Sequence, residues 1–413
     1  MRFGTDGIRG RFGSPALNPD LARRLGAALY EHGARRLAVV RDTRDSGPAL
    51  LEGLVQGFGG TLVDYGVQPT SGLSVVLERG EGDLGVAITA SHNPWFDNGL
   101  KLLGRDGRKL SEAEESAISS RTDAPAISGH RVEGRYEHAP ALSQCLPRGE
   151  WLAGVKVGLD CAHGAAAHLG PGLLHSYGAQ VHAIGIAPNG RNINEGLGAV
   201  HPERLAAEVL SSGCDVGICL DGDADRCILV DRAGRVVDGD GLLFLLARPP
   251  GVVGTVMCNA ALPRALAERD IAFQRVGVGD RKVAERMLAL AWPVGGEPSG
   301  HVLLEDGLPT GDGLLSALRV LAGGVDLGHR LRGWCPDPQV LLNLAIAHKP
   351  PLEQLVATGA AQREALERGA ERVLLRYSGT EPKLRILVEA RDAALAQELA
   401  EHIAQAADAE LGR

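Results

Sequence analysis

Three aspartates at every second position, followed at once by an arginine, are the residues of this chain best suited to chemistry. The apolar run Val216–Leu220 is typical of a buried strand, and Asp221, Asp223, Asp225 and Arg226 follow it. Carboxylates held this close repel one another unless a cation neutralises them, and oxygen ligands of this kind favour Mg²⁺ or Ca²⁺. The segment therefore predicts a divalent-metal site, and the adjacent arginine indicates a second anion there, such as a phosphate.

The residues that follow Asp221 argue against a calcium-binding EF-hand. Such a loop needs glycine at its sixth position and glutamate at its twelfth, where this chain has Arg226 and Arg232. A solvated acidic turn is the simpler alternative to a metal site.

Ser91 is a second candidate, because it follows the strand-like run 85–89. Ligands of α/β proteins bind at the carboxyl ends of such strands. The segment TASHNP lacks the G-x-S-x-G pattern of hydrolase nucleophiles, and the adjacent His92 is poorly placed to act as a base for Ser91. Taken alone, the serine is typical of a turn cap. Taken with the aspartates, a phosphorylated Ser91 would give the metal another oxygen ligand.

Two further segments have the residue types that bind phosphosugars. Hydroxyl residues around a glycine, bracketed by basic side chains, are typical of a phosphate nest, and this chain has them as Arg376, Ser378, Gly379, Thr380 and Arg385. In the glycine-flanked loop 295–301, Glu297 and Ser299 offer an acceptor and a donor to sugar hydroxyls. A polar turn is the alternative for each segment.

The elements that would position these residues alternate between strand-like and helical runs. Asn18-Pro19 can start a helix with Leu21, Leu25 and Leu29 along one face. Strand-like runs lie at 37–40, 61–63, 85–89, 155–159, 216–220, 227–230 and 254–257, and helical runs at 48–57 and 201–211. The alternation predicts an α/β protein with parallel or mixed sheets. Polar, irregular segments at about 128–150 and 323–337 predict domain boundaries.

Composition narrows the class of protein. The 413 residues, 44% of them hydrophobic, predict two to four domains. A net charge of −8 offers no basic surface for nucleic acid, and the apolar runs are too short to span a membrane. Seven scattered cysteines without CxxC pairs predict buried free thiols in a reducing compartment. The opening residues lack the apolar core of a signal peptide, so we expect a cytoplasmic protein.

The motifs together resemble the α-D-phosphohexomutase superfamily and, within it, the bacterial phosphoglucosamine mutases. The likeness is carried, in family order, by FGTDGIRG (3–10), VVRDTRDSG (39–47), TASHNP (89–94), DGDADR (221–226), GGEPSGH (295–301) and RYSGTEPKLRI (376–386). PNGRNIN (188–194) and VGDR (278–281) favour the glucosamine branch. The chain departs from the usual pattern at His163, Lys282, Pro298 and Tyr377, where asparagine, tyrosine, glutamine and proline are common in the family.

This resemblance implies a four-domain architecture around a central cleft. Three similar α/β mixed-sheet domains would be followed by a smaller C-terminal α+β domain. Residues 1–148 would carry the phosphoserine loop, 149–237 the metal-binding loop, 238–334 the sugar-binding loop and 335–413 the phosphate-binding loop.

The implied activity is the interconversion of glucosamine 6-phosphate and glucosamine 1-phosphate, which feeds UDP-N-acetylglucosamine synthesis. The reaction would pass through a phosphorylated Ser91 and glucosamine 1,6-bisphosphate, with one Mg²⁺ per active site on Ser91 and the three aspartates. Lys101 or His301 would transfer protons. Substrate would be bound by Arg9, His92, Arg226, Glu297, Ser299 and the five residues of the phosphate nest. The expected partner is a small phosphosugar, with neither nucleic acid nor membrane, and a homodimer is the assembly considered.

Three other functions stay open at the level of sequence. A phosphomannomutase or phosphoglucomutase of the same superfamily would use the same machinery on another sugar. A metal-dependent sugar phosphatase would share Ser91 and the aspartates but pass the phosphoryl group to water. A non-catalytic phosphosugar-binding protein would not need Ser91 at all.

Overall fold

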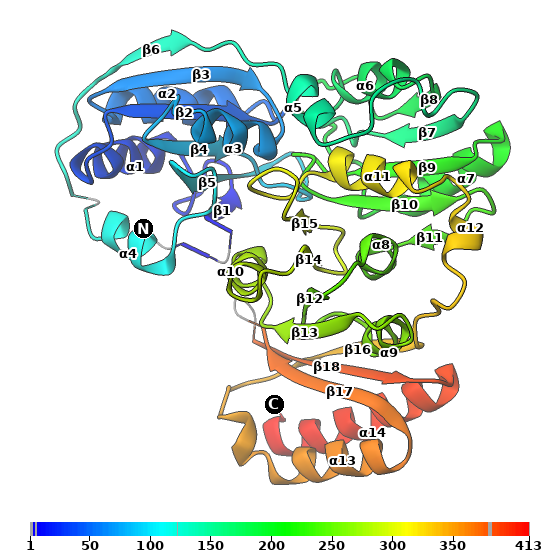
Figure 1. Cartoon of the computed structure of the whole chain (residues 1–413). Helices are drawn as coiled ribbons and strands as arrows, with labels where there is room; N and C mark the ends of the chain where they lie inside the picture. The colour runs from blue at the N-terminus through cyan, green and yellow to red at the C-terminus, as the bar shows by residue number, and fades with distance from the viewer. Residues whose placement is uncertain (1–2, 5, 122, 379–381, 413) are drawn as a thin grey trace. The chain divides into compact units, whose positions relative to one another are not determined.

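The computed structural model describes residues 3–4, 6–121, 123–378 and 382–412, and their contacts divide the chain into two units. Unit 1 consists of Met1–Met257 and Asp270–Arg332, and unit 2 of Cys258–Arg269 and Gly333–Arg413. Each unit is built on β-sheets covered by helices (Figure 1).

The first sheet of unit 1 positions the Ser91 loop. Its strand order is β1-β5-β4-β2-β3-β6, with β2, β3, β4 and β6 parallel and β5 antiparallel to β1 and β4. The strands are β1 (Ile8–Arg11), β2 (Arg36–Arg41), β3 (Thr61–Val67), β4 (Leu84–Ile88), β5 (Asp97–Gly104) and β6 (His130–Glu133), and the accompanying helices are α1 (Pro19–Glu31), α2 (Gly47–Gly57), α3 (Thr70–Glu78) and α4 (Glu112–Ser119).

Both faces of this sheet are buried, which explains its continuous apolar strands. Along β2, Leu37 and Val39 belong to the core under α1 and α2, whereas Ala38 and Val40 belong to the core under α3. Successive side chains of a strand point to opposite faces. A strand covered on both sides therefore has no polar alternation.

The second sheet of unit 1 positions the aspartates and has the order β11-β10-β9-β7-β8. Its strands are β7 (Lys156–Asp160), β8 (Gln180–Ile184), β9 (Val216–Leu220), β10 (Cys227–Asp231) and β11 (Val236–Val237), and α5 (Ala139–Gln144), α6 (Gly170–Ser176) and α7 (Pro202–Ser212) occur in the same stretch of chain. Because β9 and β10 pair as an antiparallel hairpin, the residues between them, 221–226, form its turn.

The third sheet of unit 1 positions the loop 295–301 and has the order β13-β12-β14-β15. Its strands are β12 (Gly251–Thr255), β13 (Ala272–Val276), β14 (Val294–Gly296) and β15 (Val302–Leu304), and the helices of this part are α8 (Gly239–Leu246), α10 (Asp280–Leu290), α11 (Gly313–Ala322) and α12 (Leu327–Arg330). β14 and β15 are antiparallel, so the loop 297–301 joins the ends of a hairpin.

Unit 2 contains a three-stranded antiparallel sheet of order β16-β18-β17. Helices α13 and α14 lie against one face of it (Figure 1). Its elements are α9 (Ala261–Ala267), β16 (Gln339–Ala345), the short 3₁₀ helix η1 (Leu352–Gln354), α13 (Val356–Glu367), β17 (Ala370–Tyr377), β18 (Lys383–Ala390) and α14 (Ala393–Leu411).

Most of the elements expected from sequence are confirmed. The first helix begins at Pro19, and the Asn18 side chain accepts a hydrogen bond from the backbone N–H of Leu21. The strand expected at 254–257 is displaced, because β12 ends at Thr255.

The segments expected to be irregular contain short elements. β6 and α5 lie within 128–150, and α12 lies within 323–337. β6 is an edge strand with all four residues exposed, and the two helices are six and four residues long. None of the three is long or apolar enough to leave a periodic pattern.

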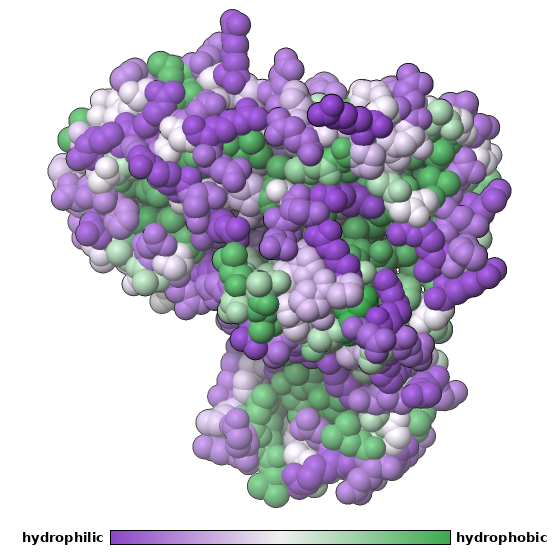
Figure 2. All heavy atoms as spheres, viewed as in Figure 1, coloured by the Kyte–Doolittle hydropathy of each residue, from purple (hydrophilic) through white to green (hydrophobic). Residues whose placement is uncertain are grey.

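The hydrophilic surface and the free cysteine thiols are those expected from the amino-acid composition. Figure 2 shows a face covered largely by hydrophilic residues. All seven cysteines, each within the described residues, are free, and five are buried. Among the described helices, none combines the length and apolarity needed to cross a bilayer.

Candidate active site

Ser91 is held in a strained conformation in the loop between β4 and β5. Its φ of 52° is in the left-handed region, which a non-glycine residue occupies only when its surroundings hold it there. The backbone N–H of Ser91 donates to Thr89 Oγ1 at 2.9 Å, and Thr89 Oγ1 donates to Asp42 Oδ2 at 2.6 Å. The buried Ser91 Oγ donates to Asp221 Oδ2 at 2.5 Å.

Arg44, which sequence reasoning missed, fixes the backbone of this loop. Its guanidinium is buried and donates to the carbonyl oxygens of Ser91 at 2.9 Å and Asn93 at 2.8 Å. It also donates to the carbonyl oxygens of Pro94 and Asp97 and, through Nε, to Asp42 Oδ2. All five N–H donors of an arginine are thereby engaged. Arg44 lies within the motif VVRDTRDSG (39–47), which contributes to the family resemblance but for which the sequence alone predicted no role.

The segment PNGRNIN contacts the same loop from the second sheet. Asn194 Nδ2 donates to the carbonyl oxygens of Ser91 at 2.8 Å and Asn93 at 2.9 Å. Gly222 lies so close that a Cβ there would be 2.6 Å from the Ser91 carbonyl oxygen. Glycine at position 222 is therefore what lets the hairpin turn approach the serine.

The aspartates 221, 223 and 225 form a buried cluster in the turn between β9 and β10. One carboxylate oxygen from each lies within 4.8 Å of the others, so the three could hold a metal ion. Thr70, another residue that the sequence did not single out, donates through Oγ1 to Asp223 Oδ2 at 2.6 Å. Asp223 Oδ1 and Asp225 Oδ1 are buried without a hydrogen-bond partner among the described residues.

These oxygens fit a hard divalent cation. Among the described residues, Asp225 Oδ1 has only the more distant His301 Nδ1 at 3.7 Å and Arg226 Nε at 3.8 Å. Buried carboxylate oxygens without a hydrogen bond are costly, and carboxylate oxygens are the donors that Mg²⁺ prefers. Burial, together with the carboxylates of Asp225 and Asp223, raises the pKa of Asp221 well above its usual range. A cation bound to the three carboxylates would remove that repulsion.

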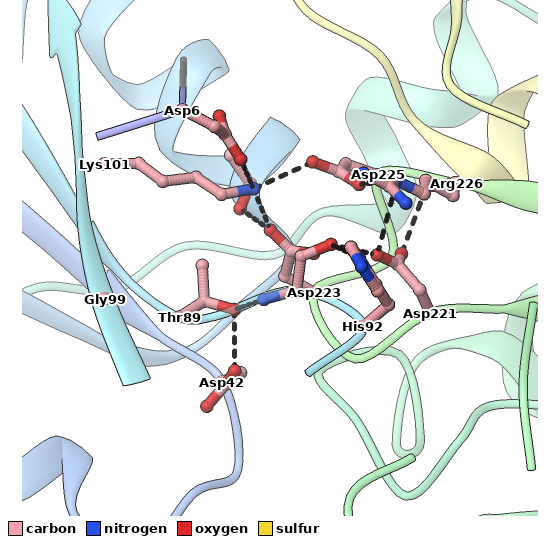
Figure 3. Close-up of polar contacts among 12 residues, drawn as sticks. Asp6, Asp42, Thr89, His92, Gly99, Lys101, Asp221, Asp223, Asp225 and Arg226 are labelled. Carbon is pink, nitrogen blue, oxygen red and sulfur yellow. Dashed lines mark hydrogen bonds and ion pairs between the residues drawn. The ribbon is translucent and has the colours of Figure 1, made fainter. Parts of the chain in front are cut away.

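Lys101 on β5 contributes a fixed positive charge to the cluster. Its ammonium lies among carboxylates, 2.6 Å from Asp223 Oδ2 and 2.9 Å from Asp225 Oδ2, with Asp6 Oδ2 at 3.4 Å (Figure 3). Burial opposes the charge, but Asp223 and Asp225 outweigh it and raise the pKa of Lys101 well above its usual value. Lys101 is 1% exposed, so it acts on the cluster and not on an open surface.

A cavity of about 160 Å³ lies beside the aspartates. It is lined by Asp6, Arg9, Lys109, Asp225, Arg226, Val278, Gly279, Asp280, Glu297 and His301. Four motifs distant in sequence, the N-terminal FGTDGIRG, DGDADR, VGDR and GGEPSGH, therefore contribute to one cavity. Lys109, which ion-pairs with Asp280 at 2.6 Å, was not predicted from the sequence.

The predicted sugar and proton-transfer residues lie at different places around this cavity. Glu297 Oε1 accepts from the Gly279 N–H at 3.1 Å, and His301 Nε2 lies 3.3 Å from Asp280 Oδ2. Ser299 is half-buried and does not line the cavity. His92 is next to Ser91, and burial together with Arg226 and Arg9 lowers its pKa to about 4.

The predicted phosphate loop belongs to unit 2. Arg376 on β17 and Arg385 on β18 are directly opposite each other in the sheet. Lys349 Nζ donates to the Ser378 carbonyl oxygen at 2.5 Å. Gly379 and Thr380 lie outside the described residues.

The geometry of unit 1 suits phosphoryl transfer. A hydroxyl contacts a carboxylate cluster that can hold a divalent ion, and the adjacent cavity is lined by both basic and acidic side chains. Stabilising a migrating phosphoryl group requires such a combination of a metal site and nearby cationic groups. His163, which stands where the family usually has asparagine, has a left-handed backbone with φ 52°. Both histidine and asparagine are enriched in this region, so the backbone conformation explains why either residue fits.

Comparison with known proteins agrees with this geometry. Family models of the phosphoglucomutase/phosphomannomutase α/β/α domains I, II and III match residues 1–126, 139–234 and 238–335, and the model of the C-terminal domain matches 341–406. The phosphoglucosamine mutase of Methylibium petroleiphilum is 43% identical and that of Delftia acidovorans 42%, each over 98% of both chains. The fold class expected from sequence is confirmed by the four domain models.

Solved structures share the fold. A phosphoglucomutase/phosphomannomutase family protein from Burkholderia thailandensis superposes with a TM-score of 0.79 at 24% identity, over 98% of this chain and 97% of the other. Aspergillus fumigatus N-acetylphosphoglucosamine mutase, solved with GlcNAc-6P and magnesium, gives 0.69 at 17% identity over 100% and 96%. With curated relatives above 40% identity along almost its whole length and all four domain models in order, this chain belongs to the phosphoglucosamine mutase family of the phosphohexomutases.

Proposed function

We propose that this enzyme interconverts glucosamine 6-phosphate and glucosamine 1-phosphate, with Ser91 as the residue that carries the phosphoryl group. The observation that carries the proposal is the 2.5 Å contact between Ser91 Oγ and Asp221, within a cluster of three buried carboxylates. The Methylibium and Delftia relatives, named for the glucosamine reaction, support this substrate.

In this proposal, a metal ion is held by Ser91 and the aspartates 221, 223 and 225. A bound Mg²⁺ would neutralise charge on the transferring phosphoryl oxygens. Phosphoserine adds a charge of about −2 at neutral pH, and Arg226, Arg9 and Lys101 supply positive charge close to it. Arg44 and Asn194 hold the serine backbone, so the attacking oxygen keeps its position through the reaction.

The cavity supplies the sugar end of the site. Glu297 would accept hydrogen bonds from sugar hydroxyls, with Ser299 as a second contact, and His92 would bind the phosphosugar. His301 lines the cavity whereas Lys101 does not, so geometry favours His301 for proton transfer. Arg376, Ser378, Gly379, Thr380 and Arg385 are proposed to bind the phosphate that is not being transferred. The boundaries near residues 148, 237 and 334 and the homodimer stay proposals as well.

Phosphopeptide analysis tests the role of Ser91. The purified protein is incubated with glucosamine 1,6-bisphosphate, digested and analysed by mass spectrometry, and conversion of glucosamine 6-phosphate is measured in parallel. We expect one phosphoryl group on Ser91 and loss of mutase activity in Ser91→Ala, with full activity in Ser120→Ala, which changes an exposed serine. Steady release of inorganic phosphate without any glucosamine 1-phosphate would identify a phosphatase instead. Faster turnover of mannose or glucose phosphates would identify one of the sister mutases.

A further inference from the structure

A second buried polar cluster in unit 1 lies outside the cavity and has no role in the proposed reaction. It consists of Ser71, Tyr136, His138 and Asp312, which come from three separate parts of the chain. Ser71 is in the first turn of α3, Tyr136 and His138 precede α5, and Asp312 is the N-cap of α11. Ser71, His138 and Asp312 are each at most 3% exposed.

The hydrogen bonds of this cluster converge on the Asp312 carboxylate. Ser71 Oγ donates to Asp312 Oδ2 at 2.5 Å, and His138 Nε2 lies 2.7 Å from the same oxygen. Because a carboxylate only accepts, Nε2 carries a proton, and Nδ1 lies 2.8 Å from the Tyr136 hydroxyl oxygen. Asp312 Oδ1 accepts from the Leu315 N–H at 2.7 Å.

These bonds exclude a nucleophilic role for Ser71. A serine nucleophile needs a base nitrogen able to take its proton. Here the proton of Ser71 points at a carboxylate, and the nearer histidine nitrogen, Nε2 at 3.1 Å, already holds a proton. The cluster is therefore a set of satisfied polar groups that joins three segments.

The segments joined by this cluster also hold the metal-binding turn 221–226. Next to Ser71, Thr70 donates to Asp223 through both its hydroxyl and its backbone N–H. Next to Asp312, the Gly313 N–H donates to the Ala224 carbonyl oxygen at 2.8 Å. The N-termini of α3 and α11 thus hold adjacent residues of the turn. The hydrogen bond from Ser71 to Asp312 joins the two helices, and His138 holds the Asp312 carboxylate that accepts this bond.

We infer that His138 is a positioning residue for the metal site, acting through Asp312 and Ser71 on the turn 221–226. The inference rests on the proposed function only for its catalytic consequence, because the geometry of the turn also sets its affinity for a divalent ion. Partners that orient metal ligands typically change metal affinity or activity by about 10- to 100-fold when they are removed.

The test measures Mn²⁺ binding in the absence of sugar, by the EPR signal of the free ion. We expect the dissociation constant to rise by about 10- to 100-fold in His138→Leu and Ser71→Ala. In His138→Gln, whose amide N–H can replace Nε2–H, we expect the affinity to stay near that of the unmodified protein. His182→Leu, at an exposed histidine on β8, is the matched control and should bind Mn²⁺ normally.

A second readout needs no metal. In the metal-free protein, hydrogen exchange of a peptide covering residues 219–226 should be faster in His138→Leu and Ser71→Ala than in His138→Gln. Unchanged Mn²⁺ affinity and unchanged exchange in folded His138→Leu would overturn the inference. If His138→Leu does not fold, Ser71→Ala decides in the same way. A protein that binds Mn²⁺ but converts no phosphosugar would refute the proposed function and leave this test intact.

Discussion

At the scale of single residues, the site depends on how closely backbones can approach. A Cβ at Gly222 would lie 2.6 Å from the Ser91 carbonyl oxygen, 2.8 Å from Ile193 Cδ1 and 3.0 Å from Asn194 Nδ2. Ser91 cannot retreat, because Arg44 and Asn194 both hold its carbonyl oxygen. A methyl group added at position 222 would therefore push the turn that carries Asp221 away from Ser91.

We predict that Gly222→Ala reduces mutase activity by about 100-fold, the size of loss that a displacement of 1 Å can cause. Crowding should also lower the free energy of unfolding by about 1–3 kcal/mol. The measurements are steady-state kinetics at saturating Mg²⁺ and urea unfolding. Gly172→Ala is the control, since a Cβ at Gly172 meets nothing within 4 Å. Equal activity in the two variants would show that the serine loop tolerates displacement.

The proximity of Ser91 to the aspartates could be predicted from sequence, but the residues that support them could not. Ser91 and the aspartates follow strands directly, and their side-chain types indicate their chemistry. Thr70 belongs to no motif, and its bond to Asp223 crosses 153 residues of chain. Nothing local marks such a residue, because its role exists only after the two sheets have packed.

At the scale of elements, helix α10 ends in an unfavourable way. Its C-cap residue, Ala291, has φ 52° and ψ 44°, a left-handed conformation in which glycine is preferred. Ala291 is exposed, so its methyl group gains little from packing. Figure 2 shows apolar surface in the region of α10, where Leu288 is 61% exposed.

The same substitution at two positions of α10 should therefore have opposite effects. Ala291→Gly should raise the free energy of unfolding by about 1 kcal/mol, since it removes the left-handed penalty of a residue with a Cβ. Ala289→Gly, at an exposed position in the last turn of the helix, should lower it by up to about 1 kcal/mol through the loss of helix propensity. Chemical denaturation of both variants is the measurement, and a change of the same sign in both would contradict this view of the cap.

Sequence patterns identified the elements where burial leaves a signature. The continuous apolar run of β2 follows from burial on both faces, and the start of α1 follows from the Asn18 cap. β6 left no such signature, because its pairing with β3 along an exposed edge places no residue in a core. β6 is held by backbone hydrogen bonds, which depend little on the type of side chain.

At the scale of the whole molecule, the metal-capable residues are unevenly distributed. The one cluster found among the described residues is in unit 1. The predicted anion-binding loop is in unit 2, whose core is formed by its own sheet with α13 and α14. Metal binding should therefore stabilise one unit directly.

We predict that Mg²⁺ slows hydrogen exchange in residues 219–226 and 89–94 but not in β17 and β18 of unit 2. At a concentration 100 times the dissociation constant, a ligand that binds only the folded state stabilises it by about 2.7 kcal/mol. Mass-detected exchange with and without Mg²⁺ is the measurement, and Asp223→Asn should remove the protection. Equal protection in unit 2 would show that a metal acts there as well.

The hydrogen bonds of Arg44 limit what this arginine can contribute to phosphate binding. Its five N–H groups are all committed to Asp42 and to backbone carbonyl oxygens. The arginine bound to the serine backbone therefore has no hydrogen left to offer an incoming anion. Although Arg44 is a basic residue close to Ser91, it should not be counted among the residues that donate hydrogen bonds to a phosphate.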